Sequence, residues 1–230
     1  MSAKTEKKNL RLCQIFKSLS GEGLRSGYPA TLVRFGGCNL SCRYCDTKYS
    51  WNYYHNTSVE EILGDERVRS AGFIIIAGGE PFYQCDEIFR LIGILAKSKI
   101  VEIETNGVNL FDNIKKLYGA LDLSDYKKNI RICSDYKTEE SDEYARGALD
   151  GFELLTEKDC IKVVVQDFGD VDLAEKLVVR FRRTNVLVSP CYGEIDPAKL
   201  ADYMIDKNYL NLKMQIQLNK FLWGDGNFEK

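Results

Sequence analysis

The sequence has few of the residues that several common protein classes require. Its single histidine, His55, stands in the aromatic and polar run Tyr53–Asn56, so a Ser-His-Asp triad has almost no candidate base. We expect His55 at the surface. The net charge is only −2, from 32 basic and 34 acidic residues, so no broad basic surface predicts direct binding to nucleic acid.

Long apolar stretches are missing too. No run approaches the length of a transmembrane helix, and the polar start, Met1–Lys8, lacks the apolar core of a signal peptide. We therefore expect a cytoplasmic protein without membrane association. The eight cysteines in 230 residues do not resemble a secreted disulfide framework. Five are scattered, mostly in apolar runs where small buried side chains are expected: Cys13, Cys85, Cys133, Cys160 and Cys191.

The chain does contain enough apolar residues for one sizeable domain, at 44% of 230 residues. Short apolar runs predict strands, and many of them are rich in valine and isoleucine with no alternation, as is typical of parallel strands buried on both faces. These runs are Ala30–Phe35, Phe73–Ala77, Ile100–Glu104, Ile130–Cys133, Ile161–Val165 and Val186–Val188. Two further strand candidates are Leu10–Phe16 and Leu212–Leu218.

Helical patterns separate these runs. Ser58–Glu61 is a capping box, Asp86–Lys97 carries one apolar stripe, and Leu173–Phe181 and Ala198–Lys207 are further candidates. Strand–helix alternation predicts an α/β fold of βα repeats. Six repeats are fewer than the eight of a closed barrel, so we predict an open, incomplete (β/α)6 TIM-like barrel. The polar stretch Asp135–Asp142 is expected to be a loop.

Three closely spaced cysteines, Cys38, Cys42 and Cys45, have the spacing C-x3-C-x2-C. A cubane iron–sulfur cluster has four irons to ligate, so three nearby thiolates leave one iron open to a small molecule. A zinc site is the alternative, but structural zinc closes with four nitrogen or sulfur ligands. His55 lies ten residues past Cys45, and Cys85 is farther still. A third possibility is that the three cysteines are grouped in a loop by chance. The residues around them are also specific, which argues against chance.

Other chemical groups follow the predicted strands in order. The cysteine loop follows Phe35, and the remaining segments are Gly78–Pro81, Glu104–Gly107, Ser134–Lys137 and Ser189-Pro190. In βα-barrels the carboxyl ends of the strands carry the active site. The sequence therefore predicts that these five segments converge on one face.

The cysteine triplet, the Gly78-Gly79-Glu80-Pro81 run and the aromatic Tyr44 together resemble the signature of the radical S-adenosylmethionine (SAM) superfamily. The resemblance implies a [4Fe–4S] cluster on Cys38, Cys42 and Cys45, with SAM chelating the open iron. It implies SAM contacts from residues near the strand ends: Tyr44 at adenine, Gly78, Gly79 and Glu80 at the methionine ammonium, Glu104 at the ribose, and Ser134, Asp135, Lys137, Ser189 and Pro190 beyond them.

Residues around the triplet narrow the resemblance. Phe16–Gly23, Val33–Leu40 and Cys45-Asp46-Thr47 resemble the 7-carboxy-7-deazaguanine synthases. That family makes the deazapurine core of queuosine-type tRNA bases. The implied activity is a carbon–nitrogen lyase reaction on 6-carboxy-5,6,7,8-tetrahydropterin, with hydrogen abstraction at C6, ring contraction and loss of ammonia. The resemblance implies a single radical SAM domain over residues 1–230, with short N- and C-terminal extensions.

The same resemblance implies further site residues and partners. Mg²⁺ is expected at the Thr47 hydroxyl with Asp46 close by, and the tail Gly224–Lys230 is a candidate cover for the site. A flavodoxin- or ferredoxin-type protein is the expected electron donor, and a homodimer is expected. The implied pterin contacts are Leu19, Ser20, Gly21, Glu22, Arg34, Ala77 and Asn219.

Two of these positions depart from the family pattern. The family often has glutamine where Ser20 stands and histidine where Asn219 stands. Two alternative functions also stay open. A glycyl-radical-enzyme activase would share the cysteines and the Gly-Gly-Glu-Pro run but would not need Glu22, Arg34 and Thr47 as a set. A non-catalytic metal-binding module would hold zinc without sulfide.

Overall fold

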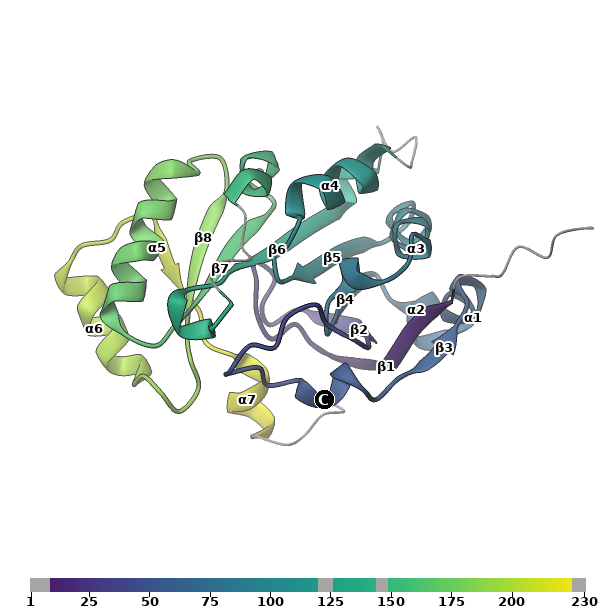
Figure 1. Ribbon diagram of the computed structural model, residues 1–230, viewed down its shortest axis with the longest axis horizontal. Helices are drawn as coiled ribbons and strands as arrows, with labels where there is room; N and C mark the ends of the chain where they lie inside the picture. Colours follow the sequence, from purple (N-terminus) through teal and green to yellow (C-terminus); the bar gives the residue numbers. More distant parts are fainter. Residues whose placement is uncertain (1–8, 120–125, 144–148, 225–230) are drawn as a thin grey trace, which may run out of the picture.

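A computed structural model describes residues 9–119, 126–143 and 149–224 of the chain. Its centre is one nine-stranded sheet with the order β3-β1-β2-β4-β5-β6-β7-β8-β9 (Figure 1). From β2 to β9 neighbouring strands are parallel, whereas β1 is antiparallel to β2 and β3. The strands are β1 Leu10–Leu19, β2 Pro29–Phe35, β3 His55–Thr57, β4 Phe73–Gly78, β5 Ile100–Thr105, β6 Ile130–Tyr136, β7 Cys160–Val165, β8 Asn185–Pro190 and β9 Leu212–Met214.

Helices follow most of the strands. The α-helices are α1 Val59–Gly64, α2 Glu66–Ser70, α3 Glu87–Ala96, α4 Leu110–Gly119, α5 Phe168–Arg180, α6 Pro197–Asp206 and α7 Leu218–Trp223. The short 3-10 helices are Lys48–Trp51, Pro81–Tyr83, Lys127–Asn129, Glu139–Ser141 and Leu149–Leu154. None of the helices in the described ranges is long and apolar enough to cross a bilayer.

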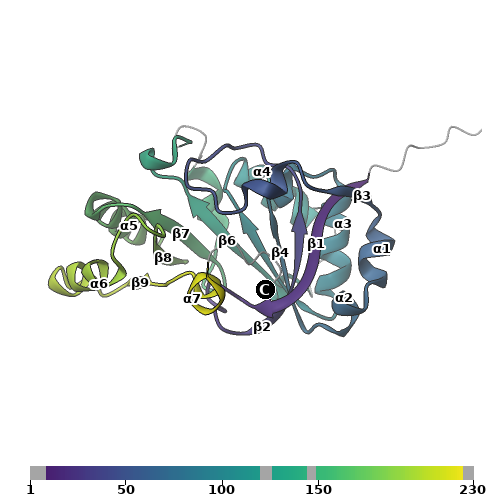
Figure 2. The same cartoon turned by 90° about the horizontal axis from the view of Figure 1, so that it is seen from below.

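The sheet is open, because β3 and β9 are its two edges and do not pair with each other. The six predicted parallel strands are confirmed as β2, β4, β5, β6, β7 and β8. Figure 2 shows α1, α2 and α3 together beside β1, and α5 and α6 beside β7 and β8. The architecture is therefore the predicted open, incomplete (β/α)6 barrel.

The core lies between the helices and one face of the sheet. Ile74 and Ile76 of β4 pack in one cluster with α1, α2 and α3, and Val163 and Val165 of β7 pack in another with α4, α5 and α6. Side chains alternate between the two faces of a strand. The opposite face of β4 is also apolar, as predicted, but β5 to β7 place Glu102, Glu104, Arg131, Asp135 and Lys162 there. The predicted burial on both faces holds for Glu102 and Lys162, but this face of β5, β6 and β7 carries charged side chains.

Several predicted elements have other bounds. The run from Leu10 extends to Leu19 as β1, and the run from Leu212 divides into β9 and the start of α7. The predicted loop from Asp135 begins inside β6, which ends at Tyr136, and Glu139–Ser141 forms a 3-10 helix. Helix α5 begins at Phe168, where Asp167 caps it by accepting a hydrogen bond from the Asp170 amide.

Helix α4 is present in the structure but was not among the helices predicted from the sequence. His55 is exposed, as predicted, but lies in β3. Of the five scattered cysteines Cys85 is half-buried, and the other four are buried as predicted.

Candidate active site

A cavity of about 340 Å³ lies at the carboxyl ends of the parallel strands. Its wall includes Arg34 at the end of β2, Ala77 and Gly78 of β4, Glu104 of β5 and Asp135 of β6. The cysteine loop and the segment that leads into α7 complete the wall. The predicted convergence at one face is confirmed for the cysteine loop and the ends of β4, β5 and β6.

Close backbone contacts fix the cysteine loop against the end of β4. The Gly79 amide donates to the Phe35 carbonyl at 2.9 Å, and the Glu80 amide donates to the Gly37 carbonyl at 2.9 Å. A Cβ on Gly78 would lie 2.1 Å from the Phe35 oxygen, and one on Gly79 would lie 2.1 Å from the Gly37 oxygen. Gly78 also has a φ of 135°, which favours glycine. The two glycines therefore allow this approach, which no other residue type permits.

Glu80 joins the ends of two strands. Its carboxylate accepts hydrogen bonds from the Phe82 amide at 3.0 Å, the Thr105 hydroxyl at 2.7 Å and the Asn106 amide at 2.7 Å. Burial raises the pKa of Glu80 to about 7, although these donors oppose the shift. The Asn106 side chain in turn donates to Asn39 Oδ1 at 2.8 Å. Glu80 thus positions the β5 end that steadies the cysteine loop.

The three thiols of the triplet line the same cavity. Burial raises the pKa of the Cys42 thiol to about 11, with Lys137 opposing the shift, and burial also raises the pKa of Cys38. Within the described residues no three histidine, cysteine or carboxylate side chains are arranged to hold one metal ion. A cubane binds each thiolate to a different iron, whereas zinc collects its ligands around one ion.

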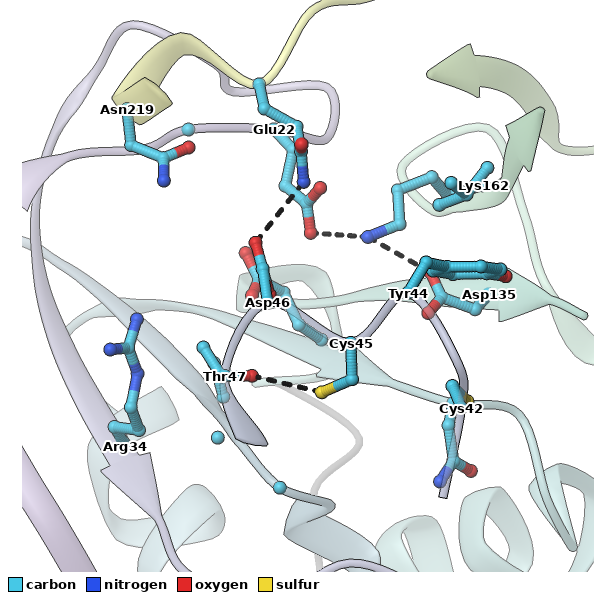
Figure 3. A pocket seen from close by; sticks show the side chains of 18 of the residues that line it. Glu22, Arg34, Cys42, Tyr44, Cys45, Asp46, Thr47, Asp135, Lys162 and Asn219 are labelled. Atoms are coloured by element: carbon cyan, nitrogen blue, oxygen red, sulfur yellow. Dashed lines mark hydrogen bonds and ion pairs between the residues drawn. The ribbon is translucent and has the colours of Figure 1, made fainter. Parts of the chain in front are cut away.

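A chain of charged side chains runs through the cavity from Glu22 to Lys137, which lies over the Tyr44 ring of the cysteine loop (Figure 3). Lys162 Nζ lies 2.5 Å from Glu22 Oε1 and 3.0 Å from Asp135 Oδ1. Lys137 Nζ lies 2.6 Å from Asp135 Oδ2. Burial raises the pKa of Asp135, but Lys137 and Lys162 lower it more, so it stays below its ordinary value. Glu104 faces the same cavity, and burial together with Glu22 raises its pKa well above the ordinary value.

Arg34 and Thr47 lie on the side of the cavity formed by β2 and the cysteine loop (Figure 3). The Arg34 guanidinium hydrogen-bonds to the Tyr49 hydroxyl and lies over the Phe16 ring, 5.1 Å from its centroid. The Thr47 hydroxyl oxygen is 3.7 Å from Cys45 Sγ. Thr47 thus joins the thiol end of the cavity to the end that carries Arg34.

The segment before and within α7 braces the loop between β1 and β2. The Gly23 amide donates to Gln215 Oε1 at 2.8 Å, and the Leu218 amide donates to the Gly21 carbonyl at 3.1 Å. A Cβ on Gly21 would lie 2.9 Å from Asn219 Oδ1. The side chain of Asn219 therefore covers the loop that carries Glu22. Residues 225–230, most of the tail considered as a cover, lie outside the described part of the chain.

Most of the sequence-predicted site residues meet in this cavity, but five do not line it. The residues that line it are Leu19, Gly21, Glu22, Arg34, Cys38, Cys42, Tyr44, Cys45, Thr47, Ala77, Gly78, Gly79, Glu104, Asp135, Lys137 and Asn219. The residues absent from its wall are Ser20, Glu80, Ser134, Ser189 and Pro190.

Each absence has a physical reason. The Ser20 side chain is fully buried and its hydroxyl donates to the Glu22 carbonyl at 2.9 Å, so a substrate contact from this side chain is not supported. The Glu80 carboxylate is occupied by the three donors described above. The hydroxyls of Ser134 and Ser189 are buried behind the strand ends, and Pro190 is buried too.

Comparison with known proteins identifies the family. The Radical SAM superfamily model matches residues 32–136. The 7-carboxy-7-deazaguanine synthase of Methanospirillum hungatei is 37% identical over 93% of this chain and 85% of the relative, and that of Clostridium acetobutylicum is 33% identical over 94% and 96%. The chain belongs to the 7-carboxy-7-deazaguanine synthase family. The crystal structure of QueE from Escherichia coli shares the fold, with a TM-score of 0.65 and 21% identity over 90% of this chain and 94% of that one.

Membership of the 7-carboxy-7-deazaguanine synthase family makes this chain a radical SAM enzyme and implies a [4Fe–4S] cluster and SAM. It disfavours both alternatives, the glycyl-radical-enzyme activase and the non-catalytic metal-binding module. The structure offers an independent test of fit. Three thiols line one cavity, and the buried Tyr44 hydroxyl on its wall has no hydrogen-bond partner within the described ranges. An unpaired buried polar group is costly, so this atom fits a site built for a polar ligand.

Sequence reasoning missed several residues of the cavity wall. Lys162, Asn106 and Lys220 line the cavity, as does Cys191, which we had expected to be only a buried side chain. The charge of Lys162 within the apolar strand Cys160–Val165 was a visible signal. Cys191 stands in the run Ser189–Gly193, which also resembles the family, so that run was the available signal.

Proposed function

We propose that this protein converts 6-carboxy-5,6,7,8-tetrahydropterin to 7-carboxy-7-deazaguanine by hydrogen abstraction at C6 and ring contraction with loss of ammonia. One observation carries the proposal: a single cavity has three thiols at one end and Glu22, Arg34 and Asn219 at the other. The names of the relatives support the same product. The product would enter queuosine-type deazapurine synthesis.

The thiol end would hold the cofactors. Cys38, Cys42 and Cys45 would ligate three irons of the [4Fe–4S] cluster, and SAM would lie along Tyr44, Gly78, Gly79, Glu104, Asp135 and Lys137, all of which line the cavity. When bound, the cluster supplies the electron that cleaves SAM to a 5′-deoxyadenosyl radical. Glu80 would act from behind the wall by fixing the end of β5. Ser134, Ser189 and Pro190 do not line the cavity, so we assign them no direct contact with SAM.

The other end suits a carboxylated pterin. The edge of a pterin presents paired donors, and a carboxylate such as Glu22 accepts two hydrogen bonds in parallel. Arg34 offers a planar fork that matches the substrate carboxylate. Leu19, Gly21, Ala77 and Asn219 would shape the remaining wall. Exclusion of water by this enclosure would protect the radical from side reactions.

We also propose that Mg²⁺ binds at the Thr47 hydroxyl. The ion keeps several waters and accepts few protein oxygens, so the Thr47 hydroxyl and a substrate oxygen are sufficient partners. Asp46 lines the cavity beside Thr47 and would hold waters of the ion from a distance. We also infer one radical SAM domain over the chain, a flavodoxin- or ferredoxin-type electron donor and a homodimer. The single sheet supports the first of these inferences.

Anaerobic turnover tests the function. Cluster-loaded protein supplied with SAM, Mg²⁺, a reductant and 6-carboxytetrahydropterin should release 7-carboxy-7-deazaguanine, detected by mass spectrometry. Cys42→Ala should abolish product and SAM cleavage, because it removes an iron ligand. Cys85→Ala, at a half-buried cysteine outside the cavity wall, is the matched control and should keep both. SAM cleavage without pterin turnover by the wild-type protein would contradict the proposed substrate.

A further inference from the structure

Lys162 is the charged residue in β7 that the motifs do not explain. It interrupts the apolar strand Cys160–Val165 and points to the cavity face of the sheet. Its side chain is only 10% exposed. Burying an ammonium group is costly unless it is paired. A buried lysine at this position therefore needs carboxylate partners around its ammonium group.

Those charges are carboxylates from three neighbouring elements. Glu22 comes from the β1–β2 loop, Glu104 from β5 and Asp135 from β6, and Glu102 lies deeper on the same face of β5. Burial and, second to it, Glu22 raise the pKa of Glu102 to about 7, while Arg131, Arg25 and Lys162 oppose the shift. Burial and Glu22 also raise the pKa of Glu104, and Lys162 lowers it. Lys162 lowers the pKa of each of Glu102, Glu104 and Asp135, and it forms ion pairs with Glu22 and Asp135.

Two contacts place the Lys162 ammonium group between the halves of the cavity. Asp135 Oδ1 at 3.0 Å holds it from β6, and Lys137 holds the other oxygen of Asp135 at 2.6 Å. The ammonium group then meets Glu22 Oε1 at 2.5 Å (Figure 3). Each carboxylate oxygen has two lone pairs. Glu22 can therefore keep its bond to Lys162 and still accept both donors of a ligand edge.

We propose that Lys162 is a positioning residue that holds the Glu22 carboxylate in place for the substrate. The inference rests on the proposed function, because it assigns Glu22 to the pterin edge. Lys162 acts through Glu22 and belongs to substrate binding, so its loss should appear in substrate affinity and KM rather than in kcat. At the cofactor end Asp135 keeps its ion pair with Lys137 when Lys162 is lost, so we expect that end to be retained.

A double-mutant cycle on pterin affinity tests this role. The proteins are wild type, Lys162→Met, Glu22→Gln and the double variant, all cluster-loaded and saturated with SAM. Methionine keeps the length of the side chain and removes its charge. Each single variant should weaken pterin binding about tenfold to a hundredfold. The double variant should bind no more than about threefold more weakly than Glu22→Gln alone, because contacting residues are not additive.

Three further measurements complete the test. KM for the pterin should rise in Lys162→Met by the same factor as the dissociation constant, with kcat within about threefold of wild type and iron content unchanged. Lys158→Met is the matched control. Its ammonium group donates to the Ile130 carbonyl at 2.7 Å, away from the cavity, and pterin affinity should stay at the wild-type value.

These measurements distinguish an error in the role of Lys162 from an error in the proposed function. Pterin binding by wild type with fully additive losses in the double variant would overturn the Lys162 role and leave the proposed function intact. Wild-type protein that cleaves SAM but binds no pterin would overturn both. A fall of kcat or iron content in Lys162→Met with unchanged pterin affinity would show that Lys162 supports the fold or the cofactor end instead.

Discussion

Thr47 can be tested for metal binding without disturbing its loop, because the loop uses its carbonyl rather than its hydroxyl. The Ser50 amide and the Ser50 hydroxyl donate to the Thr47 carbonyl at 2.9 Å and 2.8 Å. The Thr47 hydroxyl itself has the 3.7 Å contact with Cys45 Sγ. A change of that hydroxyl to a methyl group therefore isolates its role.

We predict that Thr47→Val reduces the stimulation of turnover by Mg²⁺ and weakens pterin binding about tenfold when Mg²⁺ is present, as expected for one lost polar contact. Iron content should be unchanged. The measurement is a Mg²⁺ titration under anaerobic turnover. Ser50→Ala is the control, since it breaks a loop hydrogen bond at a fully buried residue. It should lower stability and keep the Mg²⁺ response; superimposable activation curves for wild type and Thr47→Val would rule out the metal role.

At the scale of elements, the contact between the end of β4 and the start of the cysteine loop decides where the thiols stand. Gly79→Ala places a Cβ against the backbone of Gly37, immediately before Cys38. Backbone cannot swing away as a long side chain does, so the loop itself has to move. Overpacking of this kind costs about 1–3 kcal/mol, and each kcal/mol lowers Tm by about 2–4 °C in a chain of this size.

We therefore predict that Gly79→Ala lowers both Tm and the iron content after reconstitution. Gly64→Ala in α1 is the matched control, because nothing lies within 4 Å of the added Cβ. It should leave iron content at the wild-type level and Tm unchanged or higher, since alanine favours a helix. Full iron loading of Gly79→Ala would contradict the view that this contact positions the thiols.

The strands of the sheet were largely predictable from the sequence, whereas one helix and several contacts were not. Runs such as Phe73–Ala77 are strands because valine and isoleucine in short blocks have no helical period, and the motifs at their ends converge because parallel strands end at one edge. Helix α4 was missed in its polar surroundings, although Leu110, Ile114 and Leu117 are its buried stripe. The partners of Glu80 were not predictable either, since Thr105 and Asn106 meet it only after β4 and β5 pair.

At the scale of the whole molecule, the buried acids on the cavity face of the sheet connect the site to global stability. Glu102 is 2% exposed, and its Oε1 has no hydrogen-bond partner in the described residues. Burial, with Glu22 second, raises its pKa from 4.5 to about 7, while Arg131 and Arg25 oppose the shift. The folded state therefore holds a proton on Glu102 at pH values where the unfolded chain has released it.

The sign of the pH dependence follows from that difference in bound protons. Between pH 4.5 and pH 7 the folded state binds more protons than the unfolded state, so the free energy of unfolding falls as the pH rises. The contribution of Glu102 is up to about 3 kcal/mol, at about 1.4 kcal/mol for each unit of pKa difference. Glu80 and Glu104 add to the same trend, because their pKa values are raised as well.

We predict that Glu102→Gln is less sensitive to pH than wild type, because glutamine keeps the shape of the side chain and cannot ionise. The two proteins should have similar free energies of unfolding near pH 5, and the variant should be more stable near pH 8 by up to about 3 kcal/mol. Urea unfolding at both pH values, with the proteins in the same cluster state, measures the difference. Glu157→Gln, at an exposed carboxylate, should retain the wild-type dependence. Equal pH dependence in wild type and Glu102→Gln would mean that Arg25 and Arg131 keep Glu102 ionised in the folded protein, and the buried acids would then not connect the site to global stability.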